Sequence, residues 1–517
     1  MTLARGVAEM ANRRIPGDRG DGGCGMALWQ MVLLARLTGM RHLLWLMAAL
    51  CLSSITASAA TLSFTVNTSE PVVVTGTPRI AIDVGGVTRY ATYASGSGSS
   101  ALTFGYAVQA GDFDANGITL VSPVDLNGGS ISDVAGNPAS SLSFTLPDTA
   151  SVKVQTYTAA FTTSPITNSN ATAVGFAIAK APVGASFSYT ITSSGGSGSV
   201  TGSGTIASSS SHAVSGVNVA NLASGTLTLS VTVSTTAGGT GAAKTATATP
   251  TFTGTLDSVS TDAVFAMRRL RSAYTGALLR VRRSSDSTEQ DISANIAGKL
   301  DTTTLASFCG SASCYVRTWY DQSGNARDAV QATTSAQPRI VDAGVIEQYN
   351  ALPTMYLNTA SNLVSATPFT TSYTLSTVAS RNSSFTGYMK LLNVGGVSNN
   401  TYGSLGANAN NFIAMFVGNG SSWNDIGVIS PFANMTTVNV PFSMAMTVGQ
   451  NVLTPYVRGG VYNTKNGTTK AVTGLSIGGY GWTWDGRVSE VLVYGSALSA
   501  SEVTNLQANQ KTYYGFP

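Results

Sequence analysis

Two glycine-flanked segments combine tryptophan with a carboxylate, a pairing that carbohydrate recognition commonly uses. Trp482, Trp484 and Asp485 lie in one segment, and Trp423 and Asp425 lie in the other. An aromatic face covers the apolar side of a sugar ring, and a carboxylate pairs hydroxyls that binding removes from water. The two segments therefore predict sugar binding. The alternation of Trp482 with Trp484 also suits a strand whose rings pack into a core, and this alternative stays open.

A second group of oxygen-bearing side chains has the spacing of a calcium loop. Asp112, Asp114 and Asn116 alternate before Gly117, but Pro123 occupies the position where a bidentate glutamate would be expected. A hydrogen-bonded hairpin rich in Asx turns explains the same spacing. The sequence indicates no other cofactor.

Histidine is too scarce for many kinds of catalysis. The 517 residues include two histidines, His42 near the start and His212 in a serine-rich run. A Ser-His-Asp triad is therefore not expected, and a cluster of histidine metal ligands is excluded. If the protein is an enzyme, it must work with carboxylates.

The N-terminus has the layout of a secretory signal peptide. The apolar run Leu43–Leu52 follows Met40 and Arg41 and precedes small residues up to Ala60. At about 10 residues this run is too short to span a membrane, which needs about 20; an N-terminal anchor is the alternative. We expect residues 1–60 to be a leader whose true start is Met40, and the protein to be secreted or displayed on a bacterial surface.

Removing the leader changes the charge and the cysteine count. Residues 1–60 hold six arginines and three acidic residues, so the remainder carries 22 basic and 21 acidic residues. This balance predicts no nucleic-acid partner. Cys309 and Cys314 are the cysteines outside the leader, and in an exported protein they predict one small-loop disulfide. Two thiolates with no nearby histidine would be half a zinc site.

The remaining chain predicts strands almost throughout. Charged residues make up 10% of the sequence and glycine contributes 55 residues, a composition that favours strands and turns. Alternating runs predict strands, whereas Ala263–Tyr274 has a helical rhythm with Arg268 and Arg269 outward. Ser499 and Glu502 form a capping box that predicts a C-terminal helix. The runs predicted as strands are Leu62–Val66, Arg79–Val84, Leu102–Val108, Ser186–Thr192, Thr226–Val233 and Leu278–Arg283.

Arginines recur between Arg268 and Arg283. We expect them to lie on a solvated face or to pair with Asp286, Glu289 and Asp291, rather than to bind an anionic partner.

Two segments resemble bacterial immunoglobulin-like modules of large surface proteins. The first resemblance is carried by Ser69–Pro78, Ala110–Ile118 and Asp133–Asn137, and the second, weaker one by the alternating strands of residues 155–252. The resemblance implies two β-sandwiches, at residues 61–150 and 151–257.

Residues 258–517 resemble the arabinofuranosidase B catalytic domain. The resemblance rests on Tyr274–Asp286 and on Phe308–Asn325, while Gly486–Tyr494 is similar to the end of a laminin-G or concanavalin-like sandwich. It implies a jelly-roll sandwich and hydrolysis of arabinofuranosyl groups with retention. The chain is therefore expected to be all-β, with two immunoglobulin-like sandwiches followed by a concanavalin-like jelly roll and a short C-terminal helix.

The carboxylates that the resemblance requires are missing at the expected positions. The family's nucleophile is a glutamate after adjacent cysteines, and the corresponding segment of this chain, Lys390–Asn399, has neither. The family's acid/base is an aspartate after Ile-Gly-Gly, whereas Ile477-Gly478-Gly479 is followed by Tyr480. The segment Trp319–Asn325 has the composition of a structural turn.

Three hypotheses follow. We favour an exported, non-catalytic module that recognises a polysaccharide or cell-surface glycan. The second is an active α-L-arabinofuranosidase whose carboxylates have moved, with Asp485, Asp425 and Glu490 as substitutes. The third is a structural surface or phage-derived protein.

Overall fold

The computed structural model describes residues 60–382, 389–395, 403–407, 413–418, 423–428, 439–449, 452–462, 464–466, 471–478 and 484–516. Side chains are not described at a few strand positions, among them all of Trp423–Val428. The predicted leader, with Met40 and Leu43–Leu52, lies outside these residues. Within the described ranges the chain is mostly β-sheet, with two α-helices and one short 3-10 helix, which agrees with the all-β prediction.

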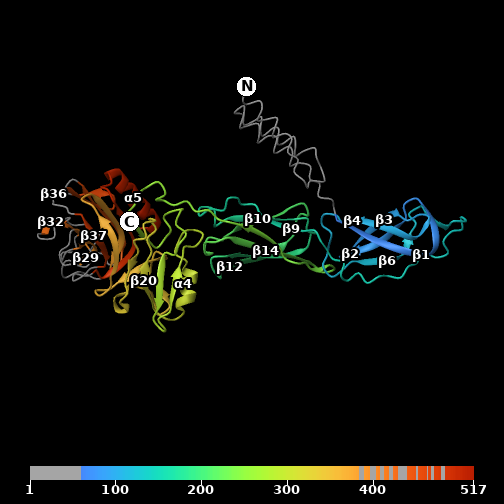
Figure 1. The fold of residues 1–517 in the computed structure, drawn as a ribbon, viewed down its shortest axis with the longest axis horizontal. Helices are drawn as coiled ribbons and strands as arrows, with labels where there is room; N and C mark the ends of the chain where they lie inside the picture. Colours follow the sequence, from blue (N-terminus) through green and yellow to red (C-terminus); the bar gives the residue numbers. More distant parts are fainter. Residues whose placement is uncertain are drawn as a thin grey trace, which may run out of the picture. The chain divides into compact units, whose positions relative to one another are not determined.

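The first described region is built on one six-stranded sheet, drawn in blue in Figure 1. Its strand order is β6-β2-β3-β4-β1-β7. Ile80, Ile82 and Val84 alternate along β2 into the core, as a strand with one buried face requires. The strands are β1 (Thr61–Thr75), β2 (Arg79–Val84), β3 (Val87–Ser95), β4 (Ser99–Ala107), β6 (Thr119–Asp125) and β7 (Ser130–Asp133), followed by the separate pair β5 (Phe113–Asp114) and β8 (Val154–Gln155).

The second region places a three-stranded sheet and a five-stranded sheet around one apolar cluster, in green in Figure 1. Phe176 of β10, in the three-stranded sheet, and Leu229 of β14, in the five-stranded sheet, both pack into this cluster. The three-stranded sheet contains β9 (Thr158–Phe161), β10 (Val174–Ala179) and β13 (His212–Val217). The other contains β11 (Ser186–Ser193), β12 (Ser199–Thr205), β14 (Leu227–Thr235), β15 (Gly239–Thr240) and β16 (Lys244–Ala248).

The strands from β17 to β38, except the separate pair β24 and β25, close on one another around the largest apolar cluster of the described residues. One series of antiparallel pairs runs β17–β38–β28–β33–β34, and another runs β27–β37–β29–β30–β31–β32. Both series send apolar side chains into the shared cluster, among them Leu375 of β28 and Leu392 of β29.

This third region contains many short strands, two α-helices and one 3-10 helix. In chain order, its first half comprises β17 (Ala263–Ala266), β18 (Leu279–Arg283), β19 (Glu289–Ile292), α4 (Thr302–Cys309), β20 (Cys314–Trp319), β21 (Ala329–Val330), η2 (Thr334–Ala336), β22 (Arg339–Asp342), β23 (Val345–Ile346), β24 (Gln348–Tyr349), β25 (Leu352–Pro353), β26 (Met355–Leu357), β27 (Leu363–Phe369) and β28 (Tyr373–Arg381). The second half comprises β29 (Met389–Val394), β30 (Gly403–Ala407), β31 (Ile413–Gly418), β32 (Trp423–Val428), β33 (Phe442–Gly449), β34 (Val452–Val457), β35 (Gly460–Val461), β36 (Lys465–Asn466), β37 (Val472–Ile477), β38 (Gly486–Tyr494) and α5 (Ala500–Tyr514).

The prediction of helix α5 is confirmed, including its start. Ser499 accepts a hydrogen bond from the Glu502 backbone, and the Glu502 side chain accepts one from the Ser499 backbone. Val503, Gln507 and Gln510 of the helix are buried. The two glutamines make hydrogen bonds that fix the helix to Gly459 and Ser376.

The prediction of a helix at Ala263–Tyr274 is wrong. Ala263–Ala266 is a strand that pairs with β38 and is buried on both faces, and the chain then turns. A short apolar run buried on all sides carries no period that separates strand from helix. Arg268, expected to face outward, is 5% exposed because Glu490 pairs with it inside the protein.

Two of the other arginines of that stretch pair with the expected carboxylates. Arg280 makes two hydrogen bonds of 2.8 Å to Asp291, and Arg283 pairs with Asp286 at 2.6 Å. Glu289 pairs instead with Arg317 of β20.

Candidate functional site

Asp485, which directly precedes β38, belongs to a group of polar side chains contributed by β38 and by nearby segments of the chain. The Tyr356 hydroxyl donates to Asp485 Oδ1 over 2.9 Å. Glu347 bridges two guanidinium groups: Arg339 reaches its Oε1 at 2.7 Å, and Arg487 reaches its Oε2 at 3.0 Å. We call these five residues the Asp485 cluster.

Strand register explains why the cluster forms. Arg339 of β22 lies opposite Tyr356 of β26, and Tyr356 lies opposite Arg487 of β38. Cross-strand partners project from the same face of a sheet, so the three side chains stand in one row. Their neighbours Met355 and Leu357 alternate to the other face and enter the core.

Glycine at position 486 allows β38 to approach β28 closely. A Cβ on Gly486 would lie 2.1 Å from the Ser380 carbonyl oxygen and 2.6 Å from Trp484 Nε1. Any other residue would therefore push β38 away from β28 and displace Asp485.

The electrostatics of the cluster suit binding of hydroxyl groups or anions. Burial raises the pKa of Tyr356, and its hydrogen bond to Asp485 raises it further. The guanidinium groups of Arg339 and Arg487 lie 5.0 and 5.8 Å from the centre of the Tyr356 ring. Both arginine side chains are about one-quarter exposed, so they present donors to solvent beside an aromatic ring and a carboxylate.

Glu490, one of the substitute carboxylates, is fully buried beneath α5. It accepts from Arg268 Nε at 2.9 Å, from Gln510 Nε2 at 3.0 Å and from the Tyr514 hydroxyl at 3.3 Å. We call these residues the Glu490 cluster. A carboxylate with no solvent access and three internal donors cannot reach a substrate, so the prediction of Glu490 as a catalytic substitute is corrected.

Asp485 and Glu490 do not form a catalytic pair. Asp485 directly precedes β38 and Glu490 lies five positions further along the chain, which at about 3.3 Å per residue corresponds to about 16 Å. Retaining glycosidases hold their two carboxyl groups about 5–5.5 Å apart, and inverting enzymes hold them at most about 9.5 Å apart.

Trp484 is a core residue rather than a sugar platform. Its side chain is fully buried, its Nε1 donates to the Ser380 carbonyl over 3.1 Å, and its ring meets Phe442 edge-on at 6.4 Å. The prediction that Trp484 covers a sugar is therefore corrected in favour of the packing alternative. Trp482 lies outside the described residues.

Trp423 and Asp425 lie in strand β32, and their side chains are outside the described part of the chain. The backbone register still places Asp425. It lies opposite Phe416, which lies opposite Ser404, which lies opposite Asn393.

This register line continues into a row of buried polar residues that the sequence did not reveal. Asn393 of β29, Ser404 of β30 and Ser476 of β37 are neighbours across the sheet and at most 1% exposed. Lys390 of β29 is also buried, and burial lowers the pKa of its ammonium group. The available sequence signal was a single polar residue between two apolar ones, at Asn393 in β29 and at Ser476 in β37.

The calcium candidate residues form a hydrogen-bonded turn. Asp112 accepts from Arg89, from the Tyr106 hydroxyl and from the Gln109 backbone. Asp114 accepts from the backbones of Gly85 and Gly117. These contacts support the hairpin alternative. Across the described ranges, no group of three or more His, Cys, Asp or Glu side chains is arranged to hold a metal ion.

The structural predictions for residues 309–325 are confirmed. Cys309 at the end of α4 and Cys314 at the start of β20 form a disulfide. Asp321 is buried and accepts from the backbones of Val264, Ser323 and Arg327. It therefore joins β17 to the turn after β20.

The Asp485 cluster was only partly predictable. The tryptophans beside it mark Asp485 in the sequence, but no pattern marks Arg339, Glu347 or Tyr356. They lie more than 120 residues earlier in the chain, and no spacing links them to Asp485 before the strands pair.

Comparisons with known proteins agree on one part of the chain. Residues 257–360 match the family described as "Alpha-L-arabinofuranosidase B, catalytic". A 66-residue segment is 44% identical to Alpha-L-arabinofuranosidase B of Aspergillus oryzae and 41% identical to that of Emericella nidulans. The match covers 13% of this chain and 13% of each relative.

Solved structures show a broader but weaker likeness. An arabinofuranosidase complexed with arabinofuranosyl-α-1,2-xylobiose aligns over 48% of this chain and 62% of its own, at 15% identity and a TM-score of 0.38. The receptor binding domain of botulinum neurotoxin D aligns over 37% of this chain and 50% of its own, at 11% identity and a TM-score of 0.30. Within the described residues, no helix is both long and apolar enough to cross a membrane.

Proposed function

We propose that residues 258–517 recognise a polysaccharide or cell-surface glycan without hydrolysing it. In this proposal the region is a concanavalin-like jelly roll of arabinofuranosidase B type, carried on immunoglobulin-like spacers at residues 61–150 and 151–257. The leader directs the protein out of the cell, to the medium or to a bacterial surface. Nucleic acid is not a partner.

The placement of the candidate carboxylates carries the proposal. Asp485 is partly exposed beside an aromatic ring and two arginines, which suits binding. Glu490 is enclosed beneath α5, too far along the strand to cooperate with it. The family match over residues 257–360 supports arabinose-containing glycans as the ligand class.

Binding to arabino-oligosaccharides tests this proposal. Isothermal titration with arabinotriose should detect binding that weakens about tenfold in Asp485→Asn and in Arg487→Gln. Asp291→Asn is the matched control, because Asp291, like Asp485, accepts a hydrogen bond from a tyrosine hydroxyl, here Tyr320, but lies outside the cluster. Equal affinity in all four proteins would contradict the assignment of the site.

The alternative is an active α-L-arabinofuranosidase. The 66-residue match to α-L-arabinofuranosidase B supports it, and Asp425 would then serve with Asp485 as the substitute carboxylates. The assay is release of 4-nitrophenol from 4-nitrophenyl α-L-arabinofuranoside. Turnover by the wild type that disappears in both Asp485→Asn and Asp425→Asn would replace the binding proposal with this one.

A further inference from the structure

A cavity of about 550 Å³ lies away from the Asp485 cluster, where residues 293–296 meet the second region. This volume falls within the range of small-molecule sites. Most of the lining residues carry hydroxyl groups, Tyr274 among them, and Arg269 and Phe252 also line the cavity. No residue of the Asp485 cluster or the Glu490 cluster lines it.

The wall of this cavity is held by backbone pairing. The Ile296 amide donates to the Leu222 carbonyl over 2.8 Å, and the Ser224 amide donates to the Ala294 carbonyl over 3.1 Å. The Ile296 side chain belongs to the apolar cluster of the second region. The cavity is therefore part of a hydrogen-bonded structure and not a gap between loops.

Arg269 is fixed in place as the cation of this cavity. Its Nε donates to the Arg271 carbonyl over 3.0 Å, and its Nη2 donates to the Ser272 carbonyl. Its guanidinium lies 4.6 Å from the centre of the Phe252 ring. Phe252 in turn lies against Gly298, where a Cβ would be 2.2 Å from the ring.

The nearby carboxylate does not neutralise Arg269 by direct pairing. Asp257 uses its two oxygens to accept from the backbones of Ser272 and Gly254. Burial lowers the pKa of the Arg269 guanidinium, and Asp257 offsets this only in part. An anionic ligand would therefore gain from a cation that is partly desolvated and already oriented.

We propose that this cavity binds a short oligosaccharide that carries a carboxylate, such as a uronic acid. Arg269 pairs with the carboxylate, while Thr226, Ser293 and Thr275 face the sugar hydroxyls. Tyr274 offers its ring edge, since its hydroxyl already donates to the Ala277 carbonyl. The site is separate from the glycan site at the Asp485 cluster and does not depend on it.

Titration of the full chain with trigalacturonate, with arabinotriose as the neutral probe, tests this inference. We expect trigalacturonate to bind and its affinity to fall at least tenfold in Arg269→Gln and in Thr275→Trp, which narrows the cavity without removing the cation. Arabinotriose binding should be unchanged in both variants, which separates this site from the Asp485 cluster.

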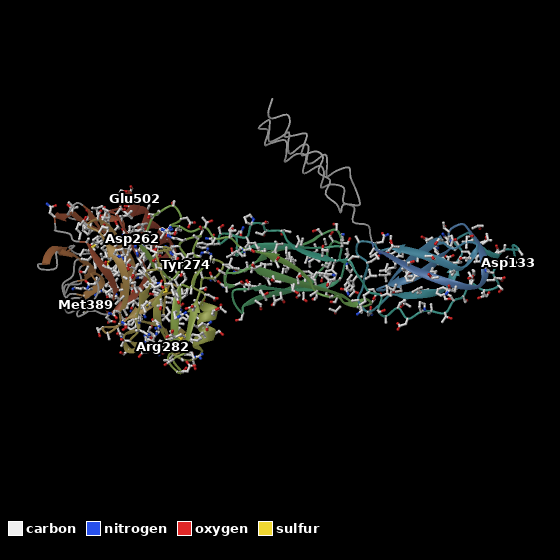
Figure 2. All side chains as sticks on the ribbon, viewed as in Figure 1. Asp133, Asp262, Tyr274, Arg282, Met389 and Glu502 are labelled. Atoms are coloured by element: carbon white, nitrogen blue, oxygen red, sulfur yellow. A yellow bond between two sulfur atoms is a disulfide. The ribbon has the colours of Figure 1, made fainter. Side chains whose placement is uncertain are left out.

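Arg282→Gln is the matched control. Arg282 also lies over an aromatic ring, that of Tyr315 at 5.3 Å, and donates to a neutral side chain, Gln337. Figure 2 shows Arg282 well apart from Tyr274. Thermal melting of each variant checks folding. No binding of trigalacturonate by the wild type, or equal loss in Arg282→Gln, would overturn the inference.

Discussion

Two arginine–glutamate networks contact the same strand, β38, and differ in almost every other respect. In the Glu490 cluster the carboxylate is fully buried and its arginine is 5% exposed. In the Asp485 cluster, Glu347 is 7% exposed but both of its arginines reach solvent. The first network is completed by the protein's own residues, whereas the second presents donors outward.

The difference teaches how to separate a structural ion pair from a binding site. Burial alone would lower the pKa of Arg268, but Glu490 raises it above its ordinary value. Each of the two buried charges is therefore stabilised by the other. A carboxylate in such a pair holds α5 against the sheet. An arginine that keeps solvent access can exchange water for a ligand at little cost to the fold.

Glu490→Gln should give the largest effect on stability. The substitution leaves the Arg268 charge buried without its counter-charge, which costs about 3–5 kcal/mol. Chemical denaturation measures the free energy of unfolding. Glu289→Gln, which removes an exposed pair with Arg317, should cost at most about 1 kcal/mol. If both variants lost the same free energy of unfolding, the proposed difference between buried and exposed ion pairs would be contradicted.

Glu347→Gln should have an intermediate effect. It weakens charge-assisted hydrogen bonds to two arginines that water can still solvate, so we expect a loss of about 1.5–3 kcal/mol. The same denaturation experiment measures it. A loss as large as that of Glu490→Gln would show that the Asp485 cluster is also mainly structural.

Asp485→Asn should change stability by less than about 1 kcal/mol, because Asp485 is partly exposed. It should lower the pKa of Tyr356 toward its ordinary value, since Asp485 contributes to the raised pKa. Difference absorbance titration against Tyr356→Phe follows this tyrosine. An unchanged pKa would mean that burial accounts for the whole shift.

The two clusters should also differ in alkaline solution. Burial raises the pKa of Tyr513, which lies beneath Arg268, to about 12. The folded state keeps this proton after the unfolded chain has lost it, so the tyrosine's contribution is complete below pH 10 and is lost between about pH 10 and 12. Tyr513→Phe should flatten the fall in melting temperature over this window, and Tyr356→Phe should change it less.

Much of the fold could be predicted because its signals are local. Arg79–Val84 is β2 as predicted, and the Ser499–Glu502 capping box begins α5. The prediction failed at Ala263–Tyr274, because its first part, Ala263–Ala266, is buried on both faces and its apolar period carries no information about strand or helix. The residues of the predicted site do not lie together: Asp485 lies in a polar cluster, while Trp484 and Glu490 are buried in the protein interior.

The sequence by itself determined the β composition, the Cys309–Cys314 disulfide and the resemblance over the arabinofuranosidase-like segment, because each depends on residues near one another in the chain. Only the tertiary structure decided that Glu490 is closed off by α5 and that Asp485 meets Tyr356. These partners come from distant strands, and whether a carboxylate is buried or exposed depends on what packs over it.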